Sequence, residues 1–134
     1  MNVTVQNAEI FISHSQQGSY FTIPLTIPEG IASLTLRYSY AFYADNSPED
    51  AGFISRQRVN IIDLGLVAPD GSQAGASGSD KTEIYIDEVR ATPGYKPQKL
   101  VPGQWQIIVG AYKVMPSGVY VNYELLFVHK ELRL

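Results

Sequence analysis

The stretch of residues 60–71 constrains the fold of this chain more than any other. Its sequence is Asn-Ile-Ile-Asp-Leu-Gly-Leu-Val-Ala-Pro-Asp-Gly. In the first half, apolar residues alternate with Asp63 and Gly65, which is the period of a β-strand that buries one face. The Pro-Asp-Gly sequence that follows is typical of a turn, because proline presets φ and glycine supplies a positive φ. A strand that runs directly into such a turn predicts antiparallel β-structure.

The same period of two recurs along the chain, separated by further turns that contain proline and glycine. The alternating runs cover residues 8–13, 21–27, 34–40, 62–66, 82–86, 105–111 and 119–127. About seven or eight short strands predict an all-β, antiparallel two-sheet β-sandwich that is jelly-roll-like. A length of 134 residues fits one domain, so residues 1–134 are expected to form a single sandwich.

Four local features refine this prediction. Pro24 lies inside an alternating run, so its strand is expected to be an edge strand or to be broken there. The short link at residues 113–118 predicts a hairpin between the last two strands. Ser47 and Pro48, followed by two acidic residues, predict a short helix over residues 48–54. The Gly-, Ser- and Ala-rich residues 71–80 predict a mobile loop.

Composition excludes several classes of function. A net charge of −3 without a basic stripe argues against nucleic-acid binding, and no apolar run is long enough to cross a membrane. The absence of cysteine excludes disulfides and thiolate metal sites. No signal peptide is visible, so a cytoplasmic location is the default expectation.

No catalytic residue is predicted. The two histidines lie near the two ends of the chain without an evident partner, and no phosphate-binding or zinc-protease motif occurs. Asp63 and Asp70 are weak candidates for metal ligands, since a sandwich can gather loop and strand carboxylates around calcium. The alternative for Asp70 is a turn-forming role, and for Asp63 a structural hydrogen bond or simple exposure to solvent.

Aromatic and basic residues supply the remaining candidates. The spacing of Tyr38, Tyr40, Trp105 and Tyr123 places them in the core. Four further tyrosines fall on the opposite phase or in loops and are expected to be exposed: Tyr85, Tyr95, Tyr112 and Tyr120. The candidates for ligand or interface contacts are Tyr85, Tyr95, Tyr120, Arg56 and Arg58.

Four segments carry a resemblance to a known family. They are residues 63–71 (Asp-Leu-Gly-Leu-Val-Ala-Pro-Asp-Gly), 75–79 (Gly-Ala-Ser-Gly-Ser), 91–97 (Ala-Thr-Pro-Gly-Tyr-Lys-Pro) and 102–113, which contain Pro-Gly-Gln-Trp. Together they resemble the β-sandwich domain that precedes the catalytic domain in bacterial PHP-type (CehA/McbA-like) metal-dependent phosphoesterases. The first and last segments are also similar to bacterial pre-peptidase C-terminal domains.

The resemblance implies an accessory module without chemistry of its own. In that family the reaction belongs to a following domain that opens with a His-x-His metal motif, and no residue here matches a metal ligand. The implied partner is a catalytic phosphoesterase domain, on which the module packs or for which it presents substrate. The alternative is an independent module that binds carbohydrate or a cell-surface polymer through its tyrosines.

Overall fold

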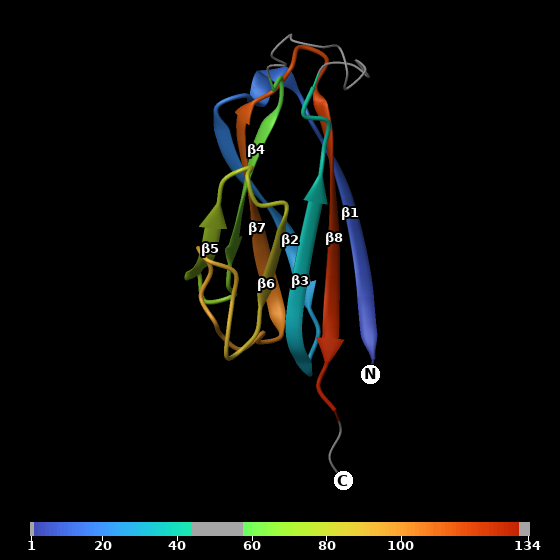
Figure 1. The fold of residues 1–134 in the computed structure, drawn as a ribbon, viewed down its shortest axis with the longest axis vertical. Coiled ribbons are helices and arrows are strands. Elements are labelled where there is room, and N and C mark those ends of the chain that lie inside the picture. The colour runs from blue at the N-terminus through green and yellow to red at the C-terminus, as the bar shows by residue number, and fades with distance from the viewer. Residues whose placement is uncertain (1, 44–57, 132–134) are drawn as a thin grey trace, which may run out of the picture.

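Two antiparallel sheets of four strands each lie face to face (Figure 1). The computed structural model describes residues 2–43 and 58–131, and in these residues it contains eight strands and one 3-10 turn, η1. The strands are β1 Val3–Ile12, β2 Ser19–Ile27, β3 Ile31–Ser39, β4 Ile61–Val67, β5 Gln73–Ser77, β6 Glu83–Ile86, β7 Gly103–Lys113 and β8 Val119–His129, and η1 is His14–Gln16. The predicted two-sheet β-sandwich is therefore confirmed, whereas the helix expected at residues 48–54 lies outside the described residues.

The strand order is that of a jelly roll. Sheet A has the order β1-β8-β3-β6 and sheet B the order β2-β7-β4-β5. The first four strands pair with the last four in reverse, β1 with β8, β2 with β7, β3 with β6 and β4 with β5. A long antiparallel ribbon has thus been rolled up, and the pairs β3–β8 and β4–β7 complete the sheets.

The inner faces of the two sheets form one hydrophobic core. Its largest fully buried side chains are Trp105, Tyr123 and Phe127. Tyr38 stacks on Tyr123 at 5.8 Å between ring centroids, and its hydroxyl donates a 2.7 Å hydrogen bond to the carbonyl of Ile62 in the opposite sheet. The prediction of a core role for Tyr38, Trp105 and Tyr123 is confirmed by their burial.

The strand that contains Pro24 lies at an edge, as predicted. β2 pairs only with β7, and it continues through Pro24 without interruption. An edge strand tolerates proline because the missing N–H need not interrupt the sheet.

Two local predictions are wrong. β7 and β8 do not form a hairpin, since they lie in different sheets. The link between them is held instead by the β1–β2 connection: His14 Nδ1 contacts the carbonyl of Val114 at 2.6 Å, and the N–H of Val114 donates to Gln17 Oε1 at 2.9 Å. Residues 71–80 are not simply a loop either, because they contain β5, which pairs with β4.

Candidate functional site

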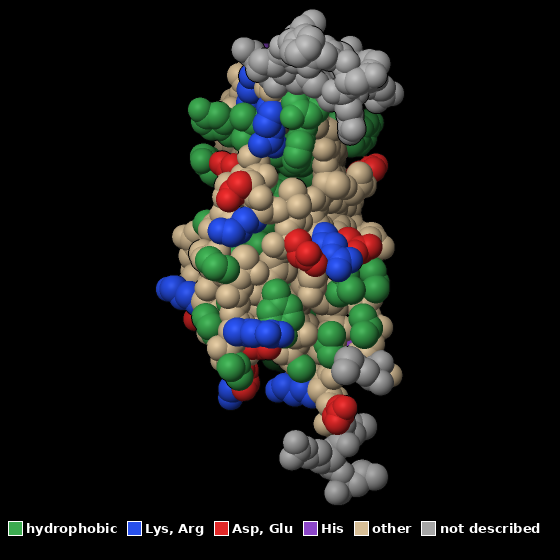
Figure 2. Space-filling view, in the orientation of Figure 1, with side chains coloured by type: hydrophobic (Ala, Val, Ile, Leu, Met, Phe, Trp, Pro, Cys, Tyr) green, Lys and Arg blue, Asp and Glu red, His purple; other side chains and the backbone are tan. Residues whose placement is uncertain are grey.

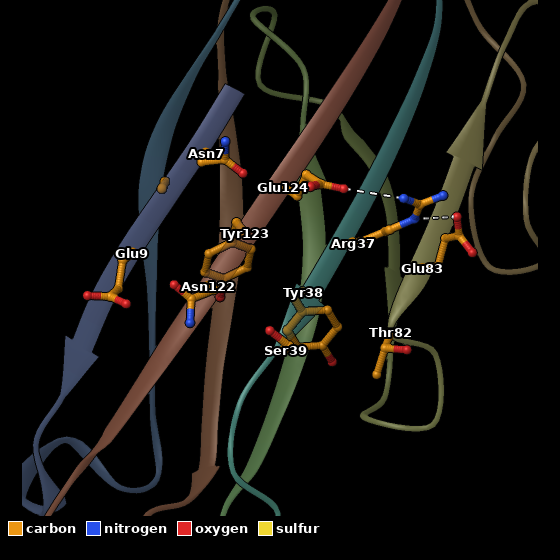
Figure 3. A pocket seen from close by; sticks show the side chains of 11 residues that line it. Asn7, Glu9, Arg37, Tyr38, Ser39, Thr82, Glu83, Asn122, Tyr123 and Glu124 are labelled. Carbon is orange, nitrogen blue, oxygen red and sulfur yellow. Dashed lines mark hydrogen bonds and ion pairs between the residues drawn. The ribbon is translucent and has the colours of Figure 1, made fainter. Parts of the chain in front are cut away.

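A shallow groove of about 690 Å³ crosses the outer face of sheet A. Four strands supply its side chains, and because the sheet is antiparallel the residues meet in cross-strand rows (Figure 3). The lining residues are Asn7, Ala8, Glu9, Arg37, Tyr38, Ser39, Thr82, Glu83, Asn122, Tyr123 and Glu124. Except for Thr82, which precedes β6, the polar side chains among them stand on paired strands, so their spacing is set by the sheet.

One row of the groove is built around Arg37. In register, Asn7 faces Glu124, which faces Arg37, which faces Glu83. Arg37 Nε donates to Glu83 Oε1 at 2.8 Å, and Nη1 donates to Glu124 Oε1 at 3.3 Å. The hydrogen bond and charge of Glu83, and to a lesser extent those of Glu124, raise the pKa of Arg37 above its usual value. Figure 2 shows acidic side chains beside basic ones near the middle of this face.

These ion pairs are exposed to solvent. The side chains of Arg37, Glu83 and Glu124 retain 53%, 53% and 43% of their accessibility. Exposed ion pairs add little to the stability of a fold, so a stabilising role does not explain this row. It remains accessible to a ligand.

The adjacent row is uncharged except for one carboxylate, and an aromatic pair lies beyond it. Glu9 faces Asn122, which faces Ser39. Two residues further along the same face, Phe11 faces Tyr120, and their ring centroids are 4.9 Å apart. The step between rows is about 7 Å, so the aromatic pair directly borders the polar groove.

The chemistry of the groove is that of hydrogen-bond acceptance and mild negative charge. Three carboxylates line it against one guanidinium, together with two side-chain amides and the hydroxyls of Ser39 and Thr82, whereas the side chains of Tyr38 and Tyr123 are buried in the core. Carboxylates accept hydrogen bonds only, whereas amides both donate and accept. The groove therefore suits a neutral ligand rich in hydroxyl groups, or a cationic one, better than an anion.

Asp63 lies on the opposite side of the sandwich, in a second groove of about 460 Å³ on the outer face of sheet B. Burial raises the pKa of Asp63, and a hydrogen bond from the backbone of Ser79 and the charge of Arg58 oppose that shift. The ring of Tyr20 and the backbone of Gly110 line the same groove. One of the two alternatives for Asp63, a structural hydrogen bond, is therefore present.

The two weak metal candidates do not lie together. β4 continues for four residues beyond Asp63 before the turn that contains Asp70, a separation of at least about 13 Å along the strand. The Asp70 carboxylate accepts hydrogen bonds from the N–H and the hydroxyl of Ser72 at 2.9 and 2.6 Å, which lower its pKa. No cluster of three metal-ligating side chains occurs among residues 2–43 and 58–131. The geometry of Asp70 is that of a turn-forming aspartate.

The three candidate tyrosines have different environments. Tyr120 is 59% exposed and borders the groove of sheet A. Tyr85 is on the same face, but its hydroxyl donates to Asp87 Oδ2 at 2.6 Å and Arg90 covers its ring at 5.2 Å.

The expectation that Tyr95 is exposed is wrong, since only 6% of it is accessible. Its ring packs over Gly75 of β5, where a side chain would collide with it, and its hydroxyl bonds Ser77 Oγ at 2.9 Å. Tyr95 is a core residue that covers the edge of sheet B.

Arg58 has structural contacts. Its guanidinium donates to Ser79 Oγ and to the hydroxyl of Tyr40, both at 2.8 Å, and lies 4.1 Å from the centre of the Phe42 ring. Arg56 lies outside the described residues. Of the four candidates among the described residues, only Tyr120 is exposed beside the groove of sheet A.

The groove residues themselves were missed at the level of sequence. Arg37, Glu124 and Asn122 occupy the polar phase of alternating runs, which predicts exposure but not proximity. Arg37 is 46 residues from Glu83 and 87 from Glu124. Only the strand order brings them together.

Comparison with models of protein families and with curated proteins finds no match for this chain. The resemblance to the accessory domain of PHP-type phosphoesterases therefore stays a prediction. In the part of the chain that the structure describes, no helix has the length and apolar character needed to cross a membrane.

Proposed function

We propose that this chain is a non-catalytic binding module whose groove on sheet A takes a carbohydrate or a similarly hydroxyl-rich ligand. The observation that carries the proposal is one juxtaposition: a row of amide, hydroxyl and carboxylate side chains borders an exposed aromatic pair. Sugars present hydroxyl groups around their ring and C–H groups on its faces. The groove offers a partner for each.

The polar row and the aromatic pair beside it would contact different groups of the sugar. Glu9 and Asn122 can accept hydrogen bonds from ligand hydroxyls, and the Asn122 amide can also donate. The ring of Tyr120 offers an apolar surface with a polar tip, a combination that is common where one side of a contact is wet. Because all three stand on strands β1 and β8, little ordering is needed on binding.

The fold agrees with this proposal without deciding it. Jelly rolls include lectin domains as well as viral capsid domains and cupins. Fold alone does not imply function, and it is the groove that favours a carbohydrate ligand.

A glycan array followed by titration calorimetry tests the proposal. Tyr120→Ala and Asn122→Ala should each weaken binding about tenfold or more, equivalent to about 1.4 kcal/mol. Tyr112→Ala is the matched control, because Tyr112 is similarly exposed, at 66%, on the outer face of sheet B. The proposal fails if no glycan binds, or if the loss at Tyr120 equals the loss at Tyr112.

A second proposal follows from the family resemblance, namely an accessory module of a PHP-type metal-dependent phosphoesterase. The observation that favours it is that two of the resembling segments, residues 63–71 and 102–113, contain paired neighbouring strands, β4 and β7. They thus form one structural unit.

Two measurements test this second proposal. The chain alone, with manganese or zinc, should not turn over phosphomonoesters or phosphodiesters, whereas it should bind a PHP-type catalytic domain supplied in trans. Turnover that survives repurification, or no binding to the catalytic domain, would count against it.

A further inference from the structure

Four strands form the sheet edges of this sandwich, and three of them are protected. β5 is covered by residues 94–96: the N–H of Ala76 donates to the carbonyl of Gly94, and the N–H of Lys96 donates to that of Ala74. β6 is covered by residues 90–92, which bond the backbone of residues 85 and 87. β2 carries Pro24, a residue that guards an edge because it has no N–H to offer.

β1 has none of these protections. It runs for ten residues at the edge of sheet A, without proline or lysine and without a bulge in its pairing with β8 (Figure 1). Within residues 2–43 and 58–131, no backbone hydrogen bond reaches its free side. A long and regular edge strand of this kind is a template for pairing with another chain.

The pairing pattern identifies which backbone groups are free. The N–H of His129 donates to the carbonyl of Asn2, and the two residues continue the β1–β8 register. Because bonded residues alternate in an antiparallel pair, the even-numbered residues of β1 bond β8. The free N–H and C=O groups therefore belong to the odd-numbered residues: Val3, Val5, Asn7, Glu9 and Phe11.

The side chains of these residues are suited to burial. Val3, Val5 and Phe11 lie on the outer face of sheet A and are 49%, 51% and 50% exposed. Glu9 is the single charged residue of β1. The strand thus combines unpaired backbone groups with half-exposed apolar side chains and little charge.

We propose that this chain forms a dimer by pairing β1 with β1 of a second copy, antiparallel, so that two copies of sheet A become one eight-stranded sheet. Another copy fits because both copies present the same unpaired edge, and a two-fold axis satisfies both at once. The axis passes between the two Asn7 residues. This arrangement pairs all five odd-numbered residues of β1.

Charge is compatible with this register, which also pairs the largest number of free backbone groups. With Asn7 at the axis, Val3 faces Phe11 of the other copy and Val5 faces Glu9 of the other copy, so no like charges are opposed. Aromatic and β-branched residues directly opposite each other stabilise a sheet. A shift of the axis to residue 9 would oppose two carboxylates and leave fewer pairs.

Charge variants at one position test this register. Val5→Glu places two carboxylates opposite the two Glu9 side chains and should raise the dimer dissociation constant about tenfold or more. Val5→Lys places an ammonium there instead and should leave the dimer intact or tighter. Thr22→Glu, on the protected edge strand β2, is the matched control and should have no effect.

A third variant removes a backbone donor. Val5→Pro deletes an N–H that faces the free edge, so it should break the dimer without loss of a β1–β8 bond. Sedimentation equilibrium over a range of concentrations measures the dimer dissociation constant of each variant, and thermal melting verifies that each is folded. A wild-type chain that stays monomeric, or equal effects of Glu and Lys at position 5, would overturn the proposal.

A cross-link locates the axis. The chain has no cysteine, so Asn7→Cys introduces a unique thiol. Bonded antiparallel residues lie about 5.5 Å apart at Cα, within the range of a disulfide. Under mild oxidation Asn7→Cys should form a covalent dimer much faster than Asn122→Cys on β8; equal rates would refute the two-fold pairing.

Discussion

Removal of the Asn60 side chain should destabilise the sandwich more than its small size suggests. Asn60 is fully buried just before β4, one of two polar residues buried among those described. Its amide nitrogen donates to the carbonyl of Ala41 at 2.8 Å, and its amide oxygen accepts from the N–H of Met115 at 2.9 Å. One side chain thus joins the segment after β3 to the link between β7 and β8.

Asn60→Ala deletes both of these hydrogen bonds. The loss of such a bond costs about 1 kcal/mol net where water can replace the partner, and about 1–3 kcal/mol where a buried group is left without one. Ala41 is exposed, so water can reach its carbonyl, whereas Met115 is only half-exposed. The expected loss is therefore about 2–3 kcal/mol, mostly from the N–H of Met115.

Chemical denaturation at neutral pH measures this loss directly. A loss of about 2–3 kcal/mol corresponds to a fall in melting temperature of about 6–12 °C for a domain of this size. Asn122→Ala is the matched control, since Asn122 is exposed on β8 and should change stability by less than about 0.5 kcal/mol. A loss at Asn60 no larger than at Asn122 would refute the reasoning.

Three further predictions follow from the environments of Gly75, Asp63 and the two weak metal candidates. Gly75→Ala should destabilise the domain by about 1–3 kcal/mol, because the new methyl group would collide with the ring of Tyr95 and lie 2.7 Å from the carbonyl oxygen of Gly94. Gly78→Ala, where the nearest atom is an oxygen of the Asp80 side chain, is the control, and equal losses would contradict the packing argument. The pKa of Asp63 is raised in the folded state, chiefly by burial. Its favourable contribution to the free energy of unfolding is therefore complete below the unfolded pKa of about 3.9 and is lost as pH rises through the folded pKa. The melting temperature of Asp63→Asn minus that of wild type should therefore increase from about pH 3 to about pH 7, and a difference that is flat with pH would contradict the shift. Because Asp63 and Asp70 are far apart, calcium and a chelator should give the same melting temperature, and a rise with calcium would reveal a site that binds the native state.

The strands with strong alternation were predictable because their signal is local. One buried face and one solvated face impose a period of two on β4, β7 and β8. Pro24 likewise carries its own signal, since proline is confined to sheet edges.

β5 was missed because its stabilisation is not local. The sequence Gln-Ala-Gly-Ala-Ser has weak strand propensity. The ring of Tyr95 packs on Gly75, and backbone bonds from residues 94–96 hold the strand in place. None of these contacts can be read from residues 73–77.

The path of the link between β7 and β8 could not be predicted either, because the contacts that hold it are not local. Its length suits a hairpin, but Val114 within it is buried and bonded to His14 and Gln17. These contacts hold the link against the β1–β2 connection, and β8 begins in the other sheet. Length alone cannot distinguish a turn within one sheet from a crossing between two.

The proposed groove and the proposed dimer make a joint prediction, because Asn7 and Glu9 belong to both. Pairing of β1 across a two-fold axis would place the two grooves side by side on one continuous sheet. A polymeric glycan could then occupy both grooves, and the second contact would be intramolecular, which can raise the overall affinity by about 10²-fold or more. A short oligosaccharide fills one groove and gains nothing. The Val5→Glu monomer should therefore lose affinity for the polymer while it binds the oligosaccharide as wild type does, since Val5 does not line the groove. Equal losses for both ligands would mean that position 5 acts on the groove itself and not through the dimer.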